Sequence, residues 1–191
     1  MRLFVAIDLP DAAKEAIAAE QQRIADALSG SRRSLRLVKP AHIHLTLLFL
    51  GEVQDTRVPA AVESMNAVSD VPRFEMTLGG AGVFPARGAP RVLWVGVMQG
   101  AASLTRLQAD IARRMRALSI EFDDREFQPH LTLGRWRESR TSDRLKVLAA
   151  AHRGAIARAH VECATLYQSH LSSAGSTYTS LARANLLDKN L

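Results

Sequence analysis

The sequence has little of what cross-links a chain or holds it in a membrane. Its 191 residues include one cysteine, Cys163, so an internal disulfide and a four-cysteine zinc site are both excluded. The apolar runs at residues 3–9, 45–50 and 92–97 are far shorter than the roughly 20 residues of a membrane-spanning helix. The N-terminal run meets an acidic residue after five apolar ones and has no signal-peptide cleavage site. These absences predict a cytoplasmic protein with no membrane contact.

Aromatic residues are scarce too, at 5% of the chain, although 47% of the residues are hydrophobic, which is enough for a globular core. Negative charge is also short, because 25 lysines and arginines face 19 acidic residues and leave a net charge of +6. Most of the positive charge is arginine, whose planar guanidinium suits phosphate oxygens. Net charge bears on association rather than on fold. Nucleic acid and a merely solvated basic surface therefore both stay open.

The hydropathy pattern describes one order of elements that occurs twice. Its first occurrence predicts a doubly buried strand at 2–9, a helix from residue 11, a short strand at 35–38, a strand at 44–50, a helix at 59–68 and a strand that begins at residue 74. A loop rich in glycine, alanine and proline is predicted for residues 79–90. The second occurrence predicts a strand at 91–97, a helix with the apolar stripe Leu104, Leu107, Ile111, Met115 and Leu118, a strand at 129–135, a helix at 142–151, and strands at 160–168 and 177–186.

The tetrapeptide His-Leu-Thr-Leu begins at His44 and again at His130, 86 residues later. A repeated tetrapeptide inside a repeated order of elements indicates internal duplication. We therefore expect one bilobal α+β domain over residues 1–191, with pseudo-symmetric halves near 1–88 and 89–191. Each half should hold an antiparallel-rich sheet with covering helices, and the two motif strands should line a central cleft.

The two motifs carry residue types suited to phosphate chemistry. Side chains alternate along a strand, so His44 and Thr46 share a face about 6.6 Å apart, as do His130 and Thr132. A phosphoryl group fits between an imidazole and a hydroxyl at that separation. Histidine titrates near neutrality, so one member of a pair can accept a proton while the other donates one. Hydrolysis of a cyclic phosphodiester needs that division and requires neither a metal nor a covalent nucleophile.

Arg135 lies five residues beyond His130 and would face away from the cleft on a regular strand. Gly134 permits a β-bulge that turns Arg135 back toward the cleft, where a guanidinium would stabilise charge on phosphate.

Other interpretations are open for each of these residues. A single His-x-Thr is more often a structural histidine bonded to backbone, and the second copy is what favours a site. His42 and His44 have the spacing of two metal ligands, but no cysteine or spaced carboxylate completes a set, so neither a metal nor a cofactor is expected. His170 is interpreted as a loop histidine that could reach the cleft, and Tyr178 fits a place in the cleft or in the core.

The segments His44-Leu-Thr-Leu-Leu-Phe-Leu-Gly and Pro129-His-Leu-Thr-Leu-Gly-Arg resemble the paired HxTx signatures of the 2H phosphoesterases. Among these they look like the bacterial and archaeal RNA 2′,3′-cyclic phosphodiesterases, once called 2′-5′ RNA ligases. Similar segments occur at residues 2–10, 90–97 and 169–178, so the resemblance covers nearly the whole chain. One departure is His42, which stands where the family often has asparagine.

The resemblance implies hydrolysis of a terminal 2′,3′-cyclic phosphate to a 2′-phosphomonoester. It assigns His44 as proton donor to the leaving 3′ oxygen and His130 as the base that activates water. The phosphate-contacting positions of the family fall on Thr46, Thr132 and Arg135. An aromatic position that can stack on the terminal base falls on Phe49.

The expected partner is RNA with a terminal 2′,3′-cyclic phosphate, tRNA fragments included, acted on by a monomer, with 2′-5′ ligation as a weak reverse reaction. The same histidines would also serve cleavage of 2′,5′-linked oligonucleotides or of another cyclic phosphate. A non-catalytic RNA-end binder is the alternative from another class, but such a protein has no need of two proton-transfer groups.

Overall fold

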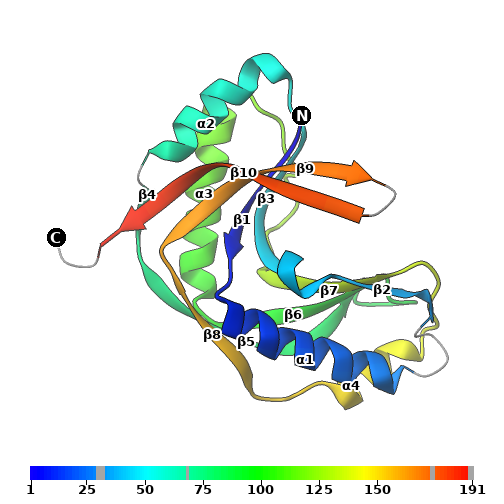
Figure 1. Cartoon of the computed structure of the whole chain (residues 1–191). Helices are drawn as coiled ribbons and strands as arrows, with labels where there is room; N and C mark the ends of the chain where they lie inside the picture. The colour runs from blue at the N-terminus through cyan, green and yellow to red at the C-terminus, as the bar shows by residue number, and fades with distance from the viewer. Residues whose placement is uncertain (29–32, 68, 173–174, 189–191) are drawn as a thin grey trace.

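The computed structural model describes residues 1–28, 33–67, 69–172 and 175–188. In these residues ten strands are joined side by side (Figure 1). The strands are β1 (Arg2–Asp8), β2 (Leu35–Leu37), β3 (His44–Glu52), β4 (Ser69–Pro72), β5 (Phe74–Phe84), β6 (Val92–Gln99), β7 (His130–Trp136), β8 (Ala155–Val161), β9 (Cys163–Ser172) and β10 (Gly175–Leu187). Their order is β4-β10-β9-β1-β3-β7-β6-β5-β8, with β2 paired to β7.

Two sheets meet at the centre of this order. The recorded pairing between β3 and β7 is the single pair Leu45 and Leu131, whereas the neighbouring pairings run over several residues. We call β4, β10, β9, β1 and β3 the first sheet, and β2, β7, β6, β5 and β8 the second sheet. Within the described residues every strand pairing is antiparallel except that of β4 with β10. The expected α+β class and the predominance of antiparallel pairing are confirmed.

The helices cross over between the sheets. They are α1 (Asp11–Ala27), α2 (Val58–Asn66), α3 (Ala101–Ala117) and α4 (Asp143–Ala150), with short 3₁₀ turns η2 (Pro40–His42) and η3 (Asp55–Arg57). α1 follows β1 of the first sheet but lies with α4 against the second sheet, and α3 follows β6 of the second sheet but packs with α2 against the first (Figure 1). None of the described helices is long and apolar enough to span a membrane.

Strands are exchanged in the same way. The first sheet is completed by β9 and β10, which come from the second half of the chain. The second sheet includes β2 and β5, which come from the first half. Each half of the sequence therefore contributes strands to both sheets, so the sheets do not divide between the halves as expected from the order of elements.

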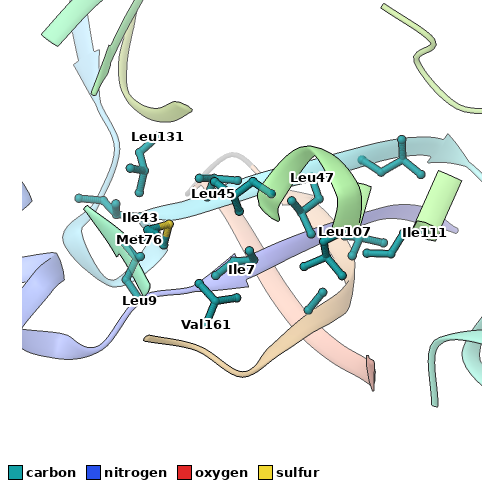
Figure 2. Packing of buried hydrophobic residues seen from close by; sticks show 14 of the residues in the cluster. Ile7, Leu9, Ile43, Leu45, Leu47, Met76, Leu107, Ile111, Leu131 and Val161 are labelled. Carbon is teal, nitrogen blue, oxygen red and sulfur yellow. The ribbon is translucent and has the colours of Figure 1, made fainter. Parts of the chain in front are cut away.

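The core lies under the junction of the two sheets. The leucines that alternate with the motif residues point into it, and Leu45 and Leu131 are fully buried (Figure 2). The stripe of α3 supplies Leu107 and Ile111 from the other side, also fully buried. Truncating such a residue to alanine costs about 2–5 kcal/mol of stability, so this packing holds the motif strands in place.

The predicted loop at 79–90 is wrong in its first part, because β5 continues to Phe84. A β-carbon on Gly82 would lie 2.2 Å from the Trp94 ring, and one on Gly79 would lie 2.6 Å from the carbonyl oxygen of Gly154. The glycines that suggested a loop are instead needed where a strand passes close to its neighbours.

The predicted strand at 160–168 is also wrong, since it combines parts of two strands. β8 pairs with β5 in the second sheet, and β9 pairs with β1 and β10 in the first. The chain passes from one sheet to the other at Glu162, the single residue between β8 and β9.

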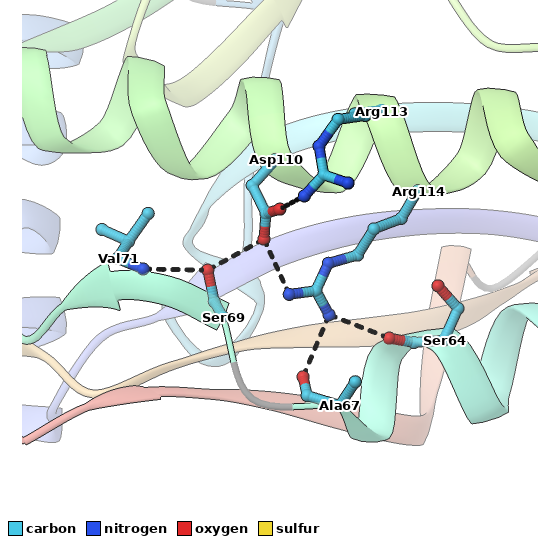
Figure 3. Close-up of polar contacts among 7 residues, drawn as sticks. All are labelled: Ser64, Ala67, Ser69, Val71, Asp110, Arg113 and Arg114. Carbon is cyan, nitrogen blue, oxygen red and sulfur yellow. Dashed lines mark hydrogen bonds and ion pairs between the residues drawn. The ribbon is translucent and has the colours of Figure 1, made fainter.

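A polar cluster ties α3 to the connection between α2 and β4 (Figure 3). Asp110 on α3 accepts hydrogen bonds from the Ser69 hydroxyl at 2.9 Å and from the Arg114 guanidinium at 2.8 Å. Arg114 also donates to the carbonyl oxygens of Ser64 and Ala67, each at 3.0 Å. These bonds satisfy the carbonyls at the end of α2 and fix α3 against the first sheet.

Candidate active site

The two motif strands are matched residue by residue. From His44 to Leu50 and from His130 to Trp136 the burial runs in one order: half-buried histidine, buried leucine, half-buried threonine, two buried residues, one exposed residue and one buried residue. The duplication seen in the sequence is therefore also a duplication of local environment.

The junction between the sheets brings the two motifs together. Because Leu45 pairs with Leu131 in an antiparallel bridge, His44 falls opposite Thr132 and Thr46 falls opposite His130. All four polar side chains share the face opposite to the buried leucines. On regular strands the two histidines would be diagonal neighbours about 7–8 Å apart, which leaves room for a phosphate group between them.

Each histidine is held by a backbone bond of the same kind. Nδ1 of His44 lies 2.8 Å from the carbonyl oxygen of His42, and Nδ1 of His130 lies 2.7 Å from that of Gln128. A carbonyl oxygen only accepts, so Nδ1 carries the hydrogen in both rings. Nε2 is then the nitrogen available to accept or donate a proton in both imidazoles.

A bulge follows the threonine in both strands. Thr46 pairs with Ala6 and Leu48 with Val5, and Thr132 pairs with Trp94 and Gly134 with Leu93, so Leu47 and Leu133 are each an extra residue. One extra residue moves the following side chains to the other face of the strand.

The bulges turn Phe49 and Arg135 onto the faces of His44 and His130, and both side chains are exposed. The expected bulge beside Gly134, which turns Arg135, is thus present, with Leu133 as its extra residue. Gly134 has a second reason to lack a side chain, because a β-carbon there would lie 2.9 Å from Leu35 and 3.2 Å from the carbonyl oxygen of Arg36.

The bulge in β7 is stabilised by hydrogen bonds from α1. The carbonyl oxygen of Leu133 accepts hydrogen bonds from Nε2 of Gln21 at 2.7 Å and from the amide of Val38 at 2.8 Å. The same nitrogen of Gln21, a buried residue, donates to the carbonyl oxygen of Val38 at 2.8 Å. A bulge leaves carbonyls without ladder partners, and here a helix side chain provides one.

Aromatic rings fix the orientation of both histidines. Phe4 stacks on His44 with 5.0 Å between ring centroids, and Tyr178 meets His44 edge-on at 5.5 Å. Phe84 meets His130 edge-on at 5.1 Å. Tyr178 therefore belongs to the site and not to the core.

The other predicted residues are placed as follows. Phe49 lies under the guanidinium of Arg2, with 5.0 Å from the carbon of that group to the ring centroid. His42 closes η2 beside Tyr178, with 5.1 Å between ring centroids. His170 is an exposed residue inside β9, so its prediction as a loop residue is wrong.

A cavity of ≈ 210 Å³ opens beside His44, and its lining includes Asp8, Lys14, His42, Tyr167 and Tyr178. Sequence reasoning missed Asp8 and Tyr167. The available signal was the alternation of side chains in β1. It puts Asp8 on the same face as Phe4 and Ala6, the face that His44 and Thr46 share.

Asp8 is the acidic residue of this cavity. It pairs with His44 in the register of β1 and β3, and its two carboxylate oxygens accept hydrogen bonds from Thr165 at 2.9 Å and Tyr167 at 2.7 Å. Burial, followed by the Asp8 carboxylate, raises the pKa of Tyr167 to about 12. The Tyr167 hydroxyl therefore keeps its proton and serves as a donor.

Burial lowers the pKa of both motif histidines below the ordinary value of 6.5. Against this, the carbonyl bond and then Asp8 favour the charged form of His44, while His42 and Lys14 disfavour it. For His130, the bond to Gln128 favours the charged form and Arg135 disfavours it. A carboxylate, Asp8, is thus among the charges beside His44, whereas the charge that acts on His130 is the guanidinium of Arg135.

Across the described ranges, no group of three or more His, Cys, Asp or Glu side chains is arranged to hold a metal ion. His42 contributes its backbone carbonyl to the site, as the acceptor for Nδ1 of His44.

The family model described as LigT like Phosphoesterase matches the chain twice, over residues 7–94 and 95–178, and each match contains one His-x-Thr motif. A protein of Archaeoglobus fulgidus named RNA 2′,3′-cyclic phosphodiesterase is 38% identical over 135 residues, which cover 71% of this chain and 72% of that protein. A crystal structure of a Thermus thermophilus protein aligns over 100% of both chains, with a TM-score of 0.78 and 27% identity. The E. coli LigT structure with 3′-AMP aligns over 97% of both chains, with a TM-score of 0.75 and 28% identity.

Proposed function

The chain belongs to the LigT-like phosphoesterases, and from that membership we propose that it hydrolyses terminal 2′,3′-cyclic phosphates of RNA to 2′-phosphomonoesters. The observation that carries the proposal is the pair of motif histidines, each bonded through Nδ1 to a backbone carbonyl so that Nε2 is the nitrogen available for proton transfer. Relatives such as the Archaeoglobus fulgidus protein bear the name of this activity.

In the proposed reaction His130 accepts a proton from water as the water oxygen attacks phosphorus in line with the 3′ oxygen. The new P–O bond forms while the bond from phosphorus to the 3′ oxygen breaks. His44 gives its proton to that leaving oxygen, so the product carries a 2′-phosphate and a free 3′ hydroxyl. One imidazole gains a proton and the other loses one, and solvent restores both.

The groups beside the histidines have supporting roles. The hydroxyls of Thr46 and Thr132 donate to the non-bridging phosphate oxygens. The guanidinium of Arg135, exposed on the same face, stabilises the negative charge that grows on those oxygens in the transition state.

Phe49 offers an exposed ring on which the terminal base can stack. The guanidinium of Arg2 over that ring adds a positive charge near the RNA backbone. The LigT structure with 3′-AMP indicates that a relative of this fold binds a nucleotide with a phosphate on its ribose. The finer assignments, namely RNA ends such as tRNA fragments, a monomer, a cytoplasmic location and weak reverse ligation, are part of the proposal.

The decisive experiment is product analysis after incubation with an RNA that ends in a 2′,3′-cyclic phosphate, in the presence of EDTA. We expect a 2′-phosphomonoester, identified by mass and by comparison with synthetic 2′- and 3′-phosphate standards. A parallel incubation with a 2′,5′-linked oligonucleotide should give cleavage far slower than hydrolysis of the cyclic phosphate, since that cleavage is the reverse of the weak ligation. Loss of turnover in EDTA with recovery on adding a divalent ion would refute the two-histidine mechanism, and a 3′-phosphate product would reverse the assigned leaving oxygen.

A further inference from the structure

The two histidines have the same backbone setting but different residues across the strand. On β1 the partner of His44 is Asp8, and on β6 the partner of His130 is Gly96. These two partners occupy equivalent places, because Ala6 and Trp94, two residues earlier on each strand, face Thr46 and Thr132.

We propose that Asp8 is the positioning residue that selects His44, and not His130, as the proton donor. The inference rests on the proposed function, because it concerns how the acid and base roles are divided in that reaction. Asp8 acts through His44 and needs no contact with the reacting atoms.

The carboxylate of Asp8 is fixed in place. Thr165 is fully buried and donates to one oxygen, and Tyr167 donates to the other. Both donors come from β9, the neighbour of β1 on the side away from β3, so the carboxylate is held between the strand of His44 and a strand from the far end of the chain. An acid that is held by two hydrogen bonds keeps its charge in a constant position relative to the imidazole.

The charged and titratable groups around His44 come from five elements: Asp8 of β1, Lys14 of α1, His42 of η2, Tyr167 of β9 and Tyr178 of β10. Tyr167 keeps its proton at neutral pH. Asp8 is therefore the anion of this set, opposed by Lys14, which also pairs with Asp11 at 3.9 Å. On the other side, His130 has Arg135 as its charged neighbour and a glycine in the place of Asp8.

This asymmetry matters because only one protonation state is productive, with His44 charged and His130 neutral. A negative charge beside His44 raises the population of that state, and a positive charge beside His130 does the same. On the alkaline limb of a plot of kcat/KM against pH, the rate depends on how readily His44 keeps its proton. On the acidic limb it depends on how readily His130 loses one.

The first test is the pH profile of Asp8→Asn with a cyclic-phosphate RNA. Removing the charge lowers the pKa of His44, so kcat/KM should fall about three- to tenfold on the alkaline limb. It should be unchanged on the acidic limb, which His130 sets. A purely structural role for Asp8 would instead lower both limbs by the same factor and would overturn the proposal.

The second test does not need activity. Histidine ring resonances titrated by NMR, with His44 assigned from the spectrum of His44→Asn, should show a lower titration midpoint for His44 in Asp8→Asn and no change for His130. An unchanged His44 midpoint would overturn the proposal. If the midpoint moves but the wild type leaves cyclic-phosphate RNA intact, the coupling of Asp8 to His44 stands and the proposed function fails.

Three further variants serve as controls. Glu63→Gln removes one negative charge from the exposed face of α2 and should leave both limbs and both midpoints unchanged. Asp8→Glu keeps the charge and should keep the alkaline limb close to that of the wild type. If Asp8→Asn does not fold, Asp8→Glu and Tyr167→Phe are measured instead, because both retain the carboxylate. Both variants must keep the titration midpoint of His44 within the wild-type range. A fall in that midpoint as large as the one expected from neutralising Asp8 would overturn the proposal.

Discussion

The strands β3 and β7 share a burial pattern, a bulge and a histidine bonded to the carbonyl two residues before it. They differ in the residue that the bulge exposes, which is Phe49 in β3 and Arg135 in β7. They differ again in the residue opposite the histidine, which is Asp8 or Gly96. The shared features give both histidines the same backbone setting, and under the proposed function the differences give the two copies of the motif separate chemical roles.

The comparison is tested most severely at the histidines themselves. General acid and base groups contribute about 10²- to 10⁴-fold each, so His44→Ala and His130→Ala should each lose at least that order in kcat. The double variant should lose far less than the product of the two, because the groups act in one concerted step. Single-turnover kinetics would measure both. Activity within threefold of wild type in either single variant would remove that histidine from the mechanism.

Substitutions of the two residues exposed by the bulges should change different kinetic constants. Arg135→Ala removes a charged donor to the transition state and should lower kcat by about 10²- to 10³-fold. Phe49→Ala removes a stacking surface worth about 1–3 kcal/mol and should mainly raise KM. Steady-state kinetics separates the two outcomes. Equal effects on kcat from both variants would mean that the two bulges expose groups with the same role, and would contradict the difference inferred between β3 and β7.

The missing carboxylate of the second half can be supplied. Gly96→Asp places an acid opposite His130, where it should raise the pKa of that imidazole and lower kcat/KM about three- to tenfold on the acidic limb only. A β-carbon at Gly96 meets the Trp94 ring at 3.3 Å and the Gly79 carbonyl oxygen at 3.4 Å, so a small adjustment is needed. Gly96→Asn carries the same bulk without the charge, and equal profiles for Asp and Asn would show that sterics alone matter.

The smallest effect concerns how the second bulge is supported. Gln21→Met keeps the length of the side chain but removes the donor to the carbonyls of Val38 and Leu133, which should lower the free energy of unfolding by about 1–3 kcal/mol. Chemical denaturation would measure this. Gln22→Met is the matched control, because Gln22 is exposed on the same helix and bonds only to Asp26 in the described contacts, and it should change stability by less than about 0.5 kcal/mol.

The parts of the fold that the sequence predicts are those with local causes. The stripe of α3 and the leucines that alternate with the motif residues are set by the periods of helix and strand, and they lie where the pattern puts them. The sequence predicts a loop at residues 79–84, where the structure has a strand, because glycine is typical both of loops and of strands that pass close to a neighbour. Only the position of Trp94 distinguishes the two cases.

The parts that could not be predicted depend on long-range pairing. Nothing local to Glu162 indicates that the chain changes sheets there, because apolar residues, Val161 and Cys163, stand directly on both sides of it. The pairing of Asp8 with His44 and its bonds to Thr165 and Tyr167 join residues far apart in the chain, so they appear only once the sheet order is known. The His-x-Thr duplicates were visible in advance because their meaning lies in repetition and not in pairing.

The crossed helices and exchanged strands make each half of the chain depend on the other half. A cut between the two family matches would leave one histidine motif on each fragment, yet each fragment would lack strands and a helix that complete its own sheet. We expect that neither fragment covers its apolar face alone, and that the fragments bring the two motifs back together only by reassembling with each other. The two family matches divide the sequence, but they do not divide the strand order.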